Sequence, residues 1–310
     1  DVFDAMGSSI RVDSLGKKAL RVLPLLNEEI NEEWISDKSR FAIDGLSRQR
    51  IDTPYLKESS RLIETDWDSA LQKIVSEINI RNKEKTMAIS GKFTDVETLY
   101  AAKEFLESLG SSYYDCRYDN VQFKPGNRES YLFNSSIQQL DEADAILIIG
   151  SNPRWEACVL NTRIRKAYLH NDCKIGLIGK SLDLTYHYTH LSESICFLNE
   201  IFEDRSTFCE ILKKAKKPFL IVGNSAINTE DGEDVLDLCA QISKKFNITN
   251  NNWNGFNILQ QDISKVGALD IKFYNREFST NFNNSVKMHL DTYKPVVFLL
   301  GADELDHSIF

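Results

Sequence analysis

The turn Gly150-Ser151-Asn152-Pro153 is the part of the sequence best suited, by residue type and position, to bind a ligand. It follows the apolar run 145–149 and precedes a segment with helical spacing, which is the order of a strand, a tight turn and a helix. Backbone amides at the start of a helix can bind a phosphate or pyrophosphate. The turn has one glycine, however, and lacks the GxGxxG and GxxxxGKS/T motifs. A tight connection without a ligand, as in any α/β domain, is the alternative.

Other polar residues offer weaker candidates. Arg163, Arg165 and Lys166 suit an anion clamp or, more commonly, a solvated helix face or a partner contact. His187 and His190 have the spacing of a metal-binding pair, but no carboxylate or cysteine accompanies them locally. The sequence contains no GxSxG motif. We therefore predict no catalytic residue and no metal ligand in this chain.

The cysteines are scattered along the chain. None lies within four residues of another, so no CxxC pair encodes a zinc or iron–sulfur site by local spacing. Such isolated cysteines are typical of buried apolar packing. They are Cys116, Cys158, Cys173, Cys196, Cys209 and Cys239.

Composition excludes several classes of function. The 310 residues, 42% of them hydrophobic and 27% charged, are typical of a globular protein with two or three domains. A net charge of −9 argues against nucleic acid as a partner. No apolar run approaches the roughly 18–20 residues that span a bilayer. Asp1 to Asp4 do not resemble a signal or transit peptide, and we expect the chain to be part of a longer protein.

The chain divides into three predicted segments. Residues 1–57 are a small β-rich piece, because 9–13 and 19–23 alternate polar and apolar residues around a glycine turn. Residues 58–200 are an α/β domain that contains the Gly150 turn, and residues 201–310 are a second, incomplete α/β domain. Capping boxes at 65–68 and 94–97 begin helices. The first of these helices has apolar residues at helical spacing: Trp67, Leu71, Ile74 and Ile78.

Three apolar runs that end in glycine indicate the fold class. They are 145–150, 219–223 and 296–301, and further strands are expected at 87–91 and 174–178. Continuous apolar strands belong to parallel sheets covered on both faces. Because helices alternate with these strands, the sequence predicts doubly wound, mostly parallel α/β domains, whose strand ends share a crevice.

Six stretches resemble the C-terminal region of the large iron–sulfur subunit of respiratory complex I, the NADH:ubiquinone oxidoreductase. They extend from the first residue to about Asp303. That region is similar to the molybdopterin oxidoreductases, so the resemblance implies α/β domains of the molybdopterin-oxidoreductase type. The stretches are DVFDAMGSSIRV, NEEINEEWISDKSRFAIDGLSRQR, NPRWEACVLNTRIRKAYLHNDCKIGLIG, DLTYHYTHL, KKAKKPFLIVGNSA and VVFLLGAD.

The resemblance implies that the turn Gly150–Pro153 corresponds to a loop that cradles the pterin dinucleotide in catalytic relatives. We expect it to be vestigial here. The next strand ends in Leu177–Lys180, which offers no carboxylate to hold the guanosine. The segment after Cys116-Arg117 offers Asp119 as a candidate molybdenum ligand, but without the glycine-rich surroundings that close approach requires. A pyrophosphate needs many charge-assisted donors, which this sequence does not assemble.

The resemblance further implies a structural, non-catalytic role in the peripheral arm of complex I, which passes electrons from NADH to ubiquinone and translocates protons. The 2Fe–2S and 4Fe–4S clusters of the family belong to an N-terminal region that this chain lacks, so no cofactor is expected. The expected partners are other peripheral-arm subunits and above all that cluster-bearing region, with Trp34, Arg40, Arg48 and Arg50 as candidate contacts. Ordinary packing and surface charge are the alternative for these four residues.

The resemblance implies a location on the matrix side of the mitochondrial inner membrane or on the cytoplasmic face of a bacterial membrane. Two other functions stay open at this point: an active molybdopterin-dependent oxidoreductase, and a nucleotide-binding module that uses the Gly150 turn.

Overall fold

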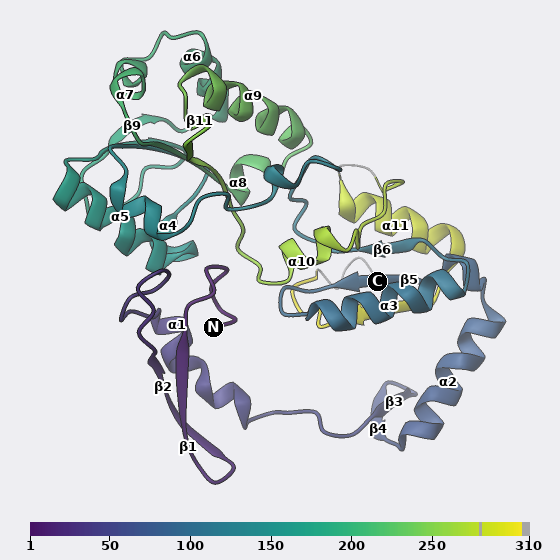
Figure 1. Ribbon diagram of the computed structural model, residues 1–310. Helices are drawn as coiled ribbons and strands as arrows, with labels where there is room; N and C mark the ends of the chain where they lie inside the picture. Colours follow the sequence, from purple (N-terminus) through teal and green to yellow (C-terminus); the bar gives the residue numbers. More distant parts are fainter. Residues whose placement is uncertain (279–280, 306–310) are drawn as a thin grey trace. The chain divides into compact units, whose positions relative to one another are not determined.

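The computed structural model describes residues 1–278 and 281–305, which form two compact units. Unit 1 comprises residues 1–12, 22–40 and 119–266, and unit 2 comprises residues 13–21, 41–118 and those from 267 onward. Figure 1 shows the elements of both units in chain order. This grouping differs from the predicted segments, because residues 58–118 belong to one unit with residues from 267 onward, whereas residues 119–200 belong to the other. The last residues of the predicted segment 201–310 lie outside the described residues.

Unit 1 contains a five-stranded parallel sheet with the order β13-β10-β7-β8-β9. From β7 the chain steps outward to β8 and β9, and it then returns to the other side of β7 with β10 and β13. The winding direction therefore reverses between β7 and β10, which is the topological switch point where α/β sheets bind ligands. The strands are β7 (Ala145–Ile149), β8 (Lys174–Ile178), β9 (Thr189–Ser192), β10 (Pro218–Gly223) and β13 (Phe256–Leu259).

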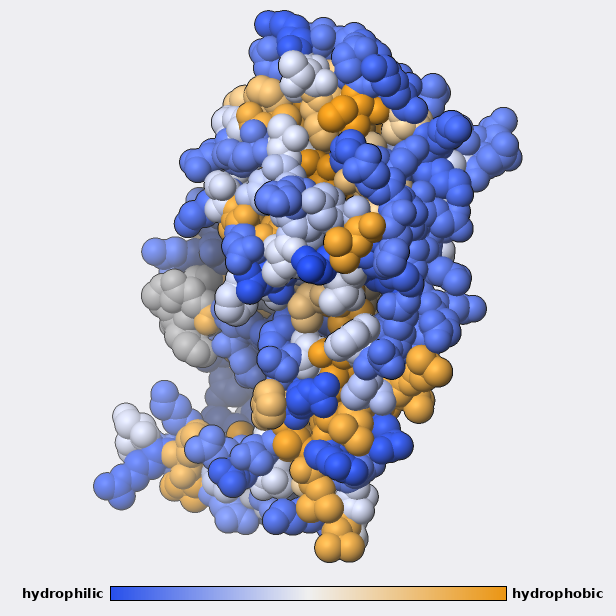
Figure 2. Space-filling model, turned by 90° about the vertical axis from the view of Figure 1, so that its left-hand side faces the viewer, coloured by the Kyte–Doolittle hydropathy of each residue, from blue (hydrophilic) through white to orange (hydrophobic). Residues whose placement is uncertain are grey.

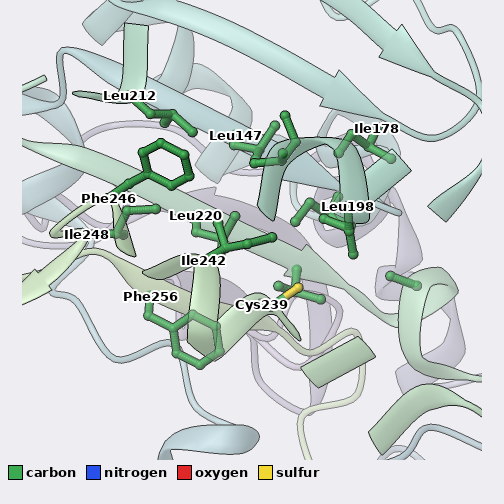
Figure 3. Packing of buried hydrophobic residues seen from close by; sticks show 14 of the residues in the cluster. Leu147, Ile178, Leu198, Leu212, Leu220, Cys239, Ile242, Phe246, Ile248 and Phe256 are labelled. Carbon is green, nitrogen blue, oxygen red and sulfur yellow. The ribbon is translucent and has the colours of Figure 1, made fainter. Parts of the chain in front are cut away.

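Helices cover both faces of this sheet. Because successive side chains of a strand point to opposite faces, Ile146 and Ile148 pack with α5 (Cys158–Asn171), whereas Leu147 packs with α9 (Gly232–Lys245). Figure 3 shows Leu147, Leu220, Cys239 and Ile242 within the hydrophobic cluster on the α9 side of the sheet. The short helices α6 (Leu198–Phe202) and α7 (Phe208–Lys214) complete it. Burial on both faces explains the continuous apolar runs of the sequence.

Unit 2 contains a three-stranded parallel sheet with the order β14-β5-β6. Its strands are β14 (Val297–Leu300), β5 (Met87–Ser90) and β6 (Tyr113–Asp115). Helix α11 (Phe282–Tyr293) packs on the face that contains Met87 and Ile89. The strand formed by the third apolar run, 296–301, therefore lies in a different sheet from the strands of the first two runs. The prediction of mostly parallel, doubly wound α/β structure is confirmed.

Aspartates cap the two predicted helices of unit 2, α2 (Trp67–Ile80) and α3 (Val96–Ser108). The Asp66 carboxylate accepts a hydrogen bond from the amide of Ser69 (2.8 Å), and the Asp95 carboxylate accepts one from the amide of Thr98 (2.7 Å). These backbone hydrogen bonds lower the pKa of both carboxyl groups. The capping boxes at 65–68 and 94–97 would make Thr65 and Thr94 the caps. That prediction was wrong by one residue, because an aspartate side chain reaches the free amides equally well.

The predicted N-terminal hairpin is confirmed as β1 (Ile10–Leu15) and β2 (Lys18–Pro24). The helical turns predicted over 27–41 are only partly present, since an Asn27–Glu32 bridge precedes the short helix α1 (Asp37–Phe41). The remaining strands and α-helices are β3 (Tyr55–Glu58), β4 (Arg61–Glu64), α4 (Pro153–Glu156), α8 (Asn224–Ile227), β11 (Thr249–Asn250), β12 (Trp253–Asn254) and α10 (Lys265–Asp270). The 3-10 turns are Ala42–Leu46, Lys83–Lys85, Arg128–Ser130, Gln138–Glu142 and Ile195–Phe197.

Gly150→Ala tests how tightly the switch point is packed. Gly150 has a φ of +57°, and a Cβ there would lie 2.6 Å from the backbone nitrogen of Ala226. We expect this variant to lose about 3 kcal/mol of unfolding free energy, from left-handed backbone strain plus overpacking. Urea unfolding followed by circular dichroism measures the loss.

Gly126→Ala is the matched control. Gly126 also has a positive φ, +85°, but nothing lies within 4 Å of a Cβ built there. The Gly126→Ala variant should lose only about 1 kcal/mol of unfolding free energy, which is the cost of the backbone strain. Equal losses in the two variants would contradict close packing at the switch point.

Candidate functional site

The turn that follows β7 lies at the switch point, and the chain itself occupies the space there. Beyond the contact between Gly150 and Ala226 of α8, a Cβ at Gly223, the last residue of β10, would collide with Ser151. The Ser225 hydroxyl donates a hydrogen bond to the carbonyl oxygen of Gly150. The turns after β7 and β10 are therefore in direct contact where a doubly wound fold would place a ligand phosphate.

The chemistry of the Gly150–Pro153 turn does not fit an anion. Helix α4 is a single turn that begins with Pro153, which has no N–H to donate. The Ser151 hydroxyl donates to the Glu156 carboxylate (2.6 Å), so a negative charge lies beside the turn. Among the described residues, no partner reaches the buried side-chain oxygens of Asn152 and Asn224, and both are acceptors. The Glu156 carboxylate beside the turn would repel a phosphate.

The basic cluster on α5 is used internally. Arg163 is only 2% exposed, and its guanidinium bonds the carboxylates of Asp141 (2.6 Å) and Glu32 (3.0 Å). The Lys166 ammonium bonds the same two carboxylates, at 2.9 Å and 2.6 Å. Hydrogen bonds to Glu32 and Asp141 raise the pKa of Lys166. We call this set of four residues, Arg163, Lys166, Glu32 and Asp141, the Arg163 cluster. Its two cations and two anions neutralise one another, so it is not a clamp for an external anion.

The Arg163 cluster fastens an N-terminal segment to the sheet of unit 1. Arg163 also donates to the carbonyl oxygens of Glu28 and Ile30, which adds main-chain contacts to the ion pairs. A buried guanidinium is costly unless all its donors are satisfied, and here residues 28–32 supply most of the acceptors. The sequence interpretation considered a partner surface but missed this partner within the chain. The acidic run at 28–33 was the available signal.

The two candidate histidines lie in an extended segment and not on a helix. His187 precedes the strand β9, His190 belongs to it, and His190 Nε2 is 2.8 Å from the carbonyl oxygen of Gly179. In residues 1–278 and 281–305, no group of three or more histidine, cysteine or acidic side chains is placed to hold a metal ion.

Asp119 pairs with a buried lysine, and no partner within the described residues reaches its second carboxylate oxygen. One of its carboxylate oxygens bonds the ammonium of Lys265 at 2.7 Å, and Lys265 is only 2% exposed. A metal at Asp119 would have to share the negative charge of this carboxylate with a buried lysine. Breaking such a pair leaves an uncompensated buried charge.

The candidate partner contacts fall in both units. Trp34 and Arg40 belong to unit 1, and Arg48 and Arg50 belong to unit 2. Trp34 is 53% exposed, Arg40 is half-buried, and the other two are exposed. Arg48 lies 3.5 Å from the carboxylate of Asp44, an exposed pair that contributes little to stability.

Arg163→Met tests the anchoring role of the Arg163 cluster. Removing one member of a buried ion cluster should cost about 3–5 kcal/mol of unfolding free energy. We expect residues 27–34 to become sensitive to limited proteolysis before the rest of unit 1 unfolds. The control is Arg165→Met, which removes an exposed side chain of the same helix that bonds the carbonyl oxygen of Thr185. Equal protease sensitivity in both variants would contradict the anchoring role.

Thiol reactivity tests the prediction that the cysteines serve as apolar packing. Cys196 is exposed and Cys158 half-buried, whereas the other four cysteines are buried. Burial raises the pKa of the Cys173 and Cys239 thiols to about 12, so neither ionises near neutral pH. We expect Ellman's reagent to modify Cys196 first at pH 8, and the buried thiols only after denaturation. Rapid modification of Cys239 in the folded protein would contradict this assignment.

Two family models match the sequence. The model described as molybdopterin oxidoreductase matches residues 50–308. A model described as the 4Fe-4S domain of NADH-ubiquinone oxidoreductase NDSU1/NuoG-like proteins matches residues 1–44. This second match refines the predicted β-rich piece, since it assigns its first residues to a 4Fe-4S domain family. Residues 1–44 contain no cysteine, however, so this segment has no thiolate to ligate a cluster.

Curated relatives match almost the whole chain. The 75 kDa subunit of NADH-ubiquinone oxidoreductase from Reclinomonas americana is 38% identical over 98% of this chain and 46% of its own length. A subunit of the Rickettsia bellii NADH-quinone oxidoreductase is 40% identical over 98% of this chain and 43% of its own length. The mitochondrial 78 kDa subunit of Candida albicans is 39% identical over 99% of this chain and 42% of its own length. This chain therefore spans less than half the length of these relatives.

Among solved structures, acetylene hydratase from Pelobacter acetylenicus aligns with a TM-score of 0.47 at 13% identity, covering 88% of this chain and 42% of that chain.

In the described residues of our protein, no helix is both long and apolar enough to cross a membrane. By its family model the chain belongs to the molybdopterin oxidoreductase family, and its curated relatives are the 75 kDa-type subunits of NADH-quinone oxidoreductases.

Proposed function

We propose that this chain is a structural, non-catalytic part of the peripheral arm of NADH:quinone oxidoreductase, complex I. The main support is the closed switch point, where Gly150 packs against Ala226. A molybdopterin-oxidoreductase scaffold whose crevice is filled by its own turns retains a shape but has no group to bind a charged prosthetic molecule. The turn Gly150–Pro153 is then a vestige of a pterin loop. The electron transfer from NADH to quinone belongs to other parts of the assembly.

The segment that matches the 4Fe-4S domain model supports a role in holding the cluster-bearing region. Its exposed apolar side chains include Leu25, Leu26 and Trp34, at 51%, 64% and 53% exposure. The Asn31 side chain donates to the carbonyl oxygens of Leu25 (3.2 Å) and Trp34 (3.1 Å), which brings these residues close together. We call this the Leu25–Trp34 surface. An apolar surface of this kind suits the rest of the cluster-bearing domain.

Figure 2 shows hydrophobic side chains gathered in the lower part of the face that it presents. The Arg163 cluster fixes residues 28–32 of the same segment on α5. A rigid base and an exposed apolar surface together give a partner a defined position. On this proposal the first predicted segment, residues 1–57, connects the α/β body to the clusters.

The proposed partners are other peripheral-arm subunits and, above all, the region with the 2Fe–2S and 4Fe–4S clusters. The proposed location is the matrix side of the mitochondrial inner membrane, or the cytoplasmic face of the membrane in a bacterium. Relatives from both kinds of source support these two options.

Purification of the tagged chain with its native assembly, followed by mass spectrometry and metal analysis, tests the proposal. We expect complex I peripheral-arm subunits and iron, without stoichiometric molybdenum or tungsten. One molybdenum or tungsten per chain would overturn the non-catalytic assignment, and recovery of the chain without complex I subunits would overturn the assignment to the peripheral arm.

A pair of substitutions locates the contact. Leu25→Asp combined with Trp34→Asp should reduce recovery of the cluster-bearing region at least tenfold, because two charges would enter an apolar interface. The control is Leu169→Asp, which alters a side chain of similar exposure, 58%, on α5. Equal effects of the two changes would exclude the Leu25–Trp34 surface as the contact.

A further inference from the structure

Helix α2 presents an apolar face that the described residues do not cover. Trp67, Leu71, Ile74, Val75 and Ile78 recur at helical spacing within an arc of about 100°. Of these five, Ile78 alone is buried, and Trp67, Leu71 and Val75 are each more than half exposed. The sequence analysis identified four of these side chains, all except Val75, as apolar residues at helical spacing. The structure leaves most of the face that they form exposed.

An isolated helix of this length is marginal in water. Helices shorter than about 12–15 residues need tertiary packing to stay folded, and α2 has 14 residues. The exposed ion pairs of Glu77 with Lys73 and Arg81 stabilise the helix little, and the Asp66 cap fixes only its first turn. The apolar face of α2 therefore needs a partner.

The edge strand β14 of the same unit is also incomplete. It pairs only with β5, so its other edge has main-chain donors and acceptors that no strand within the described residues satisfies. Its residues Val297–Leu300 are all apolar, and Leu299 is 45% exposed. Edge strands are normally protected by charges, prolines or bulges, and strands this apolar belong inside a parallel sheet.

A hydrogen bond joins the end of helix α2 to the start of strand β14. The guanidinium of Arg81, the residue after α2, donates to the carbonyl oxygen of Lys294 at 2.7 Å. Lys294 comes just before β14 in the chain. The carboxyl end of the helix is thus held beside the start of the strand, and one occupant can reach both.

We infer that the open edge of β14 and the apolar face of α2 form one docking surface for a βα unit: a parallel strand that pairs with β14, and an amphipathic helix that covers α2. The apolar residues of the docked helix would face Leu71 and Val75, and the main chain of the docked strand would extend the sheet. The surface is distinct from the Leu25–Trp34 surface, which belongs to unit 1.

The occupant is polypeptide from the part of the 75 kDa-type subunit that these residues do not match. The three curated relatives align over 42–46% of their lengths, so more than half of each lies outside the matched region. A second copy of the chain is less suitable, because a twofold axis would pair two β14 edges antiparallel in an otherwise parallel sheet. The inference rests on the family assignment and the exposed elements, and it does not need the absence of chemistry in unit 1.

Photo-crosslinking in the native assembly identifies the occupant. Leu71→p-benzoyl-phenylalanine and, separately, Leu299→p-benzoyl-phenylalanine place the probe on α2 and on β14. We expect both positions to crosslink to peptides of one polypeptide that aligns with the unmatched part of the 75 kDa-type relatives. Crosslinks to a second copy of the same peptides, to a protein of another family, or to two different polypeptides would overturn the inference, and so would the absence of any crosslink.

Hydrogen exchange gives a second measurement. The amides of residues 67–80 and 297–300 should exchange at least tenfold more slowly in the assembly than in the isolated 310-residue chain. Leu71→Asp combined with Val75→Asp should abolish that protection, while Ser76→Asp on the opposite face should preserve it. The melting temperature of the isolated chain should not change, since both replaced leucine and valine side chains are more than half exposed.

Equal exchange rates in the assembly and in the isolated chain would refute the docking surface. Failure of the proposed function would be recognised separately, because the assembly would then lack complex I subunits while the crosslinked peptide still identifies what covers α2.

Discussion

The contact between the turns that follow β7 and β10 limits what the α/β body of unit 1 can do. A doubly wound sheet leaves a crevice where its winding direction reverses, and that crevice is the usual ligand site. Here Gly150 and Gly223 allow backbone and small side chains to fill it, with Ala226 and Ser151 in the closest positions. Close packing of this kind is stable because it leaves few voids.

The charged groups around this sheet form ion pairs with one another. The Arg163 cluster pairs two cations with two carboxylates, and Lys265 pairs with Asp119. Desolvating such ions is expensive, and the attraction between them repays the cost only when geometry and further hydrogen bonds are good. The arrangement therefore specifies where the N-terminal segment lies on α5 more than it adds stability.

Apolar surface shows the opposite pattern. The crevice is filled, whereas the Leu25–Trp34 surface in unit 1 and the face of α2 in unit 2 stay exposed. Exposed apolar surface of this kind marks protein–protein contacts in soluble proteins. Within the described residues, the chain thus satisfies its own interior where a catalytic relative would hold a cofactor, and leaves open the places where other polypeptide can pack. That distribution is expected for a scaffold.

The sequence by itself determined the strands at 87–91, 145–150, 174–178, 219–223 and 296–301, the N-terminal hairpin, the helices that begin near 66 and 95, and the parallel α/β class. Continuous apolar runs and glycine stops depend on local chemistry and can therefore be read from the sequence. It also located the Gly150 turn. Only the tertiary structure decided that this turn is closed, that Arg163 holds the chain's own residues 28–32, and that β14 joins β5 across more than 200 residues of chain. These outcomes depend on which distant segments meet. An acidic run, a basic cluster or an apolar helix face has the same pattern in sequence whether its partner is solvent, the same chain or another polypeptide.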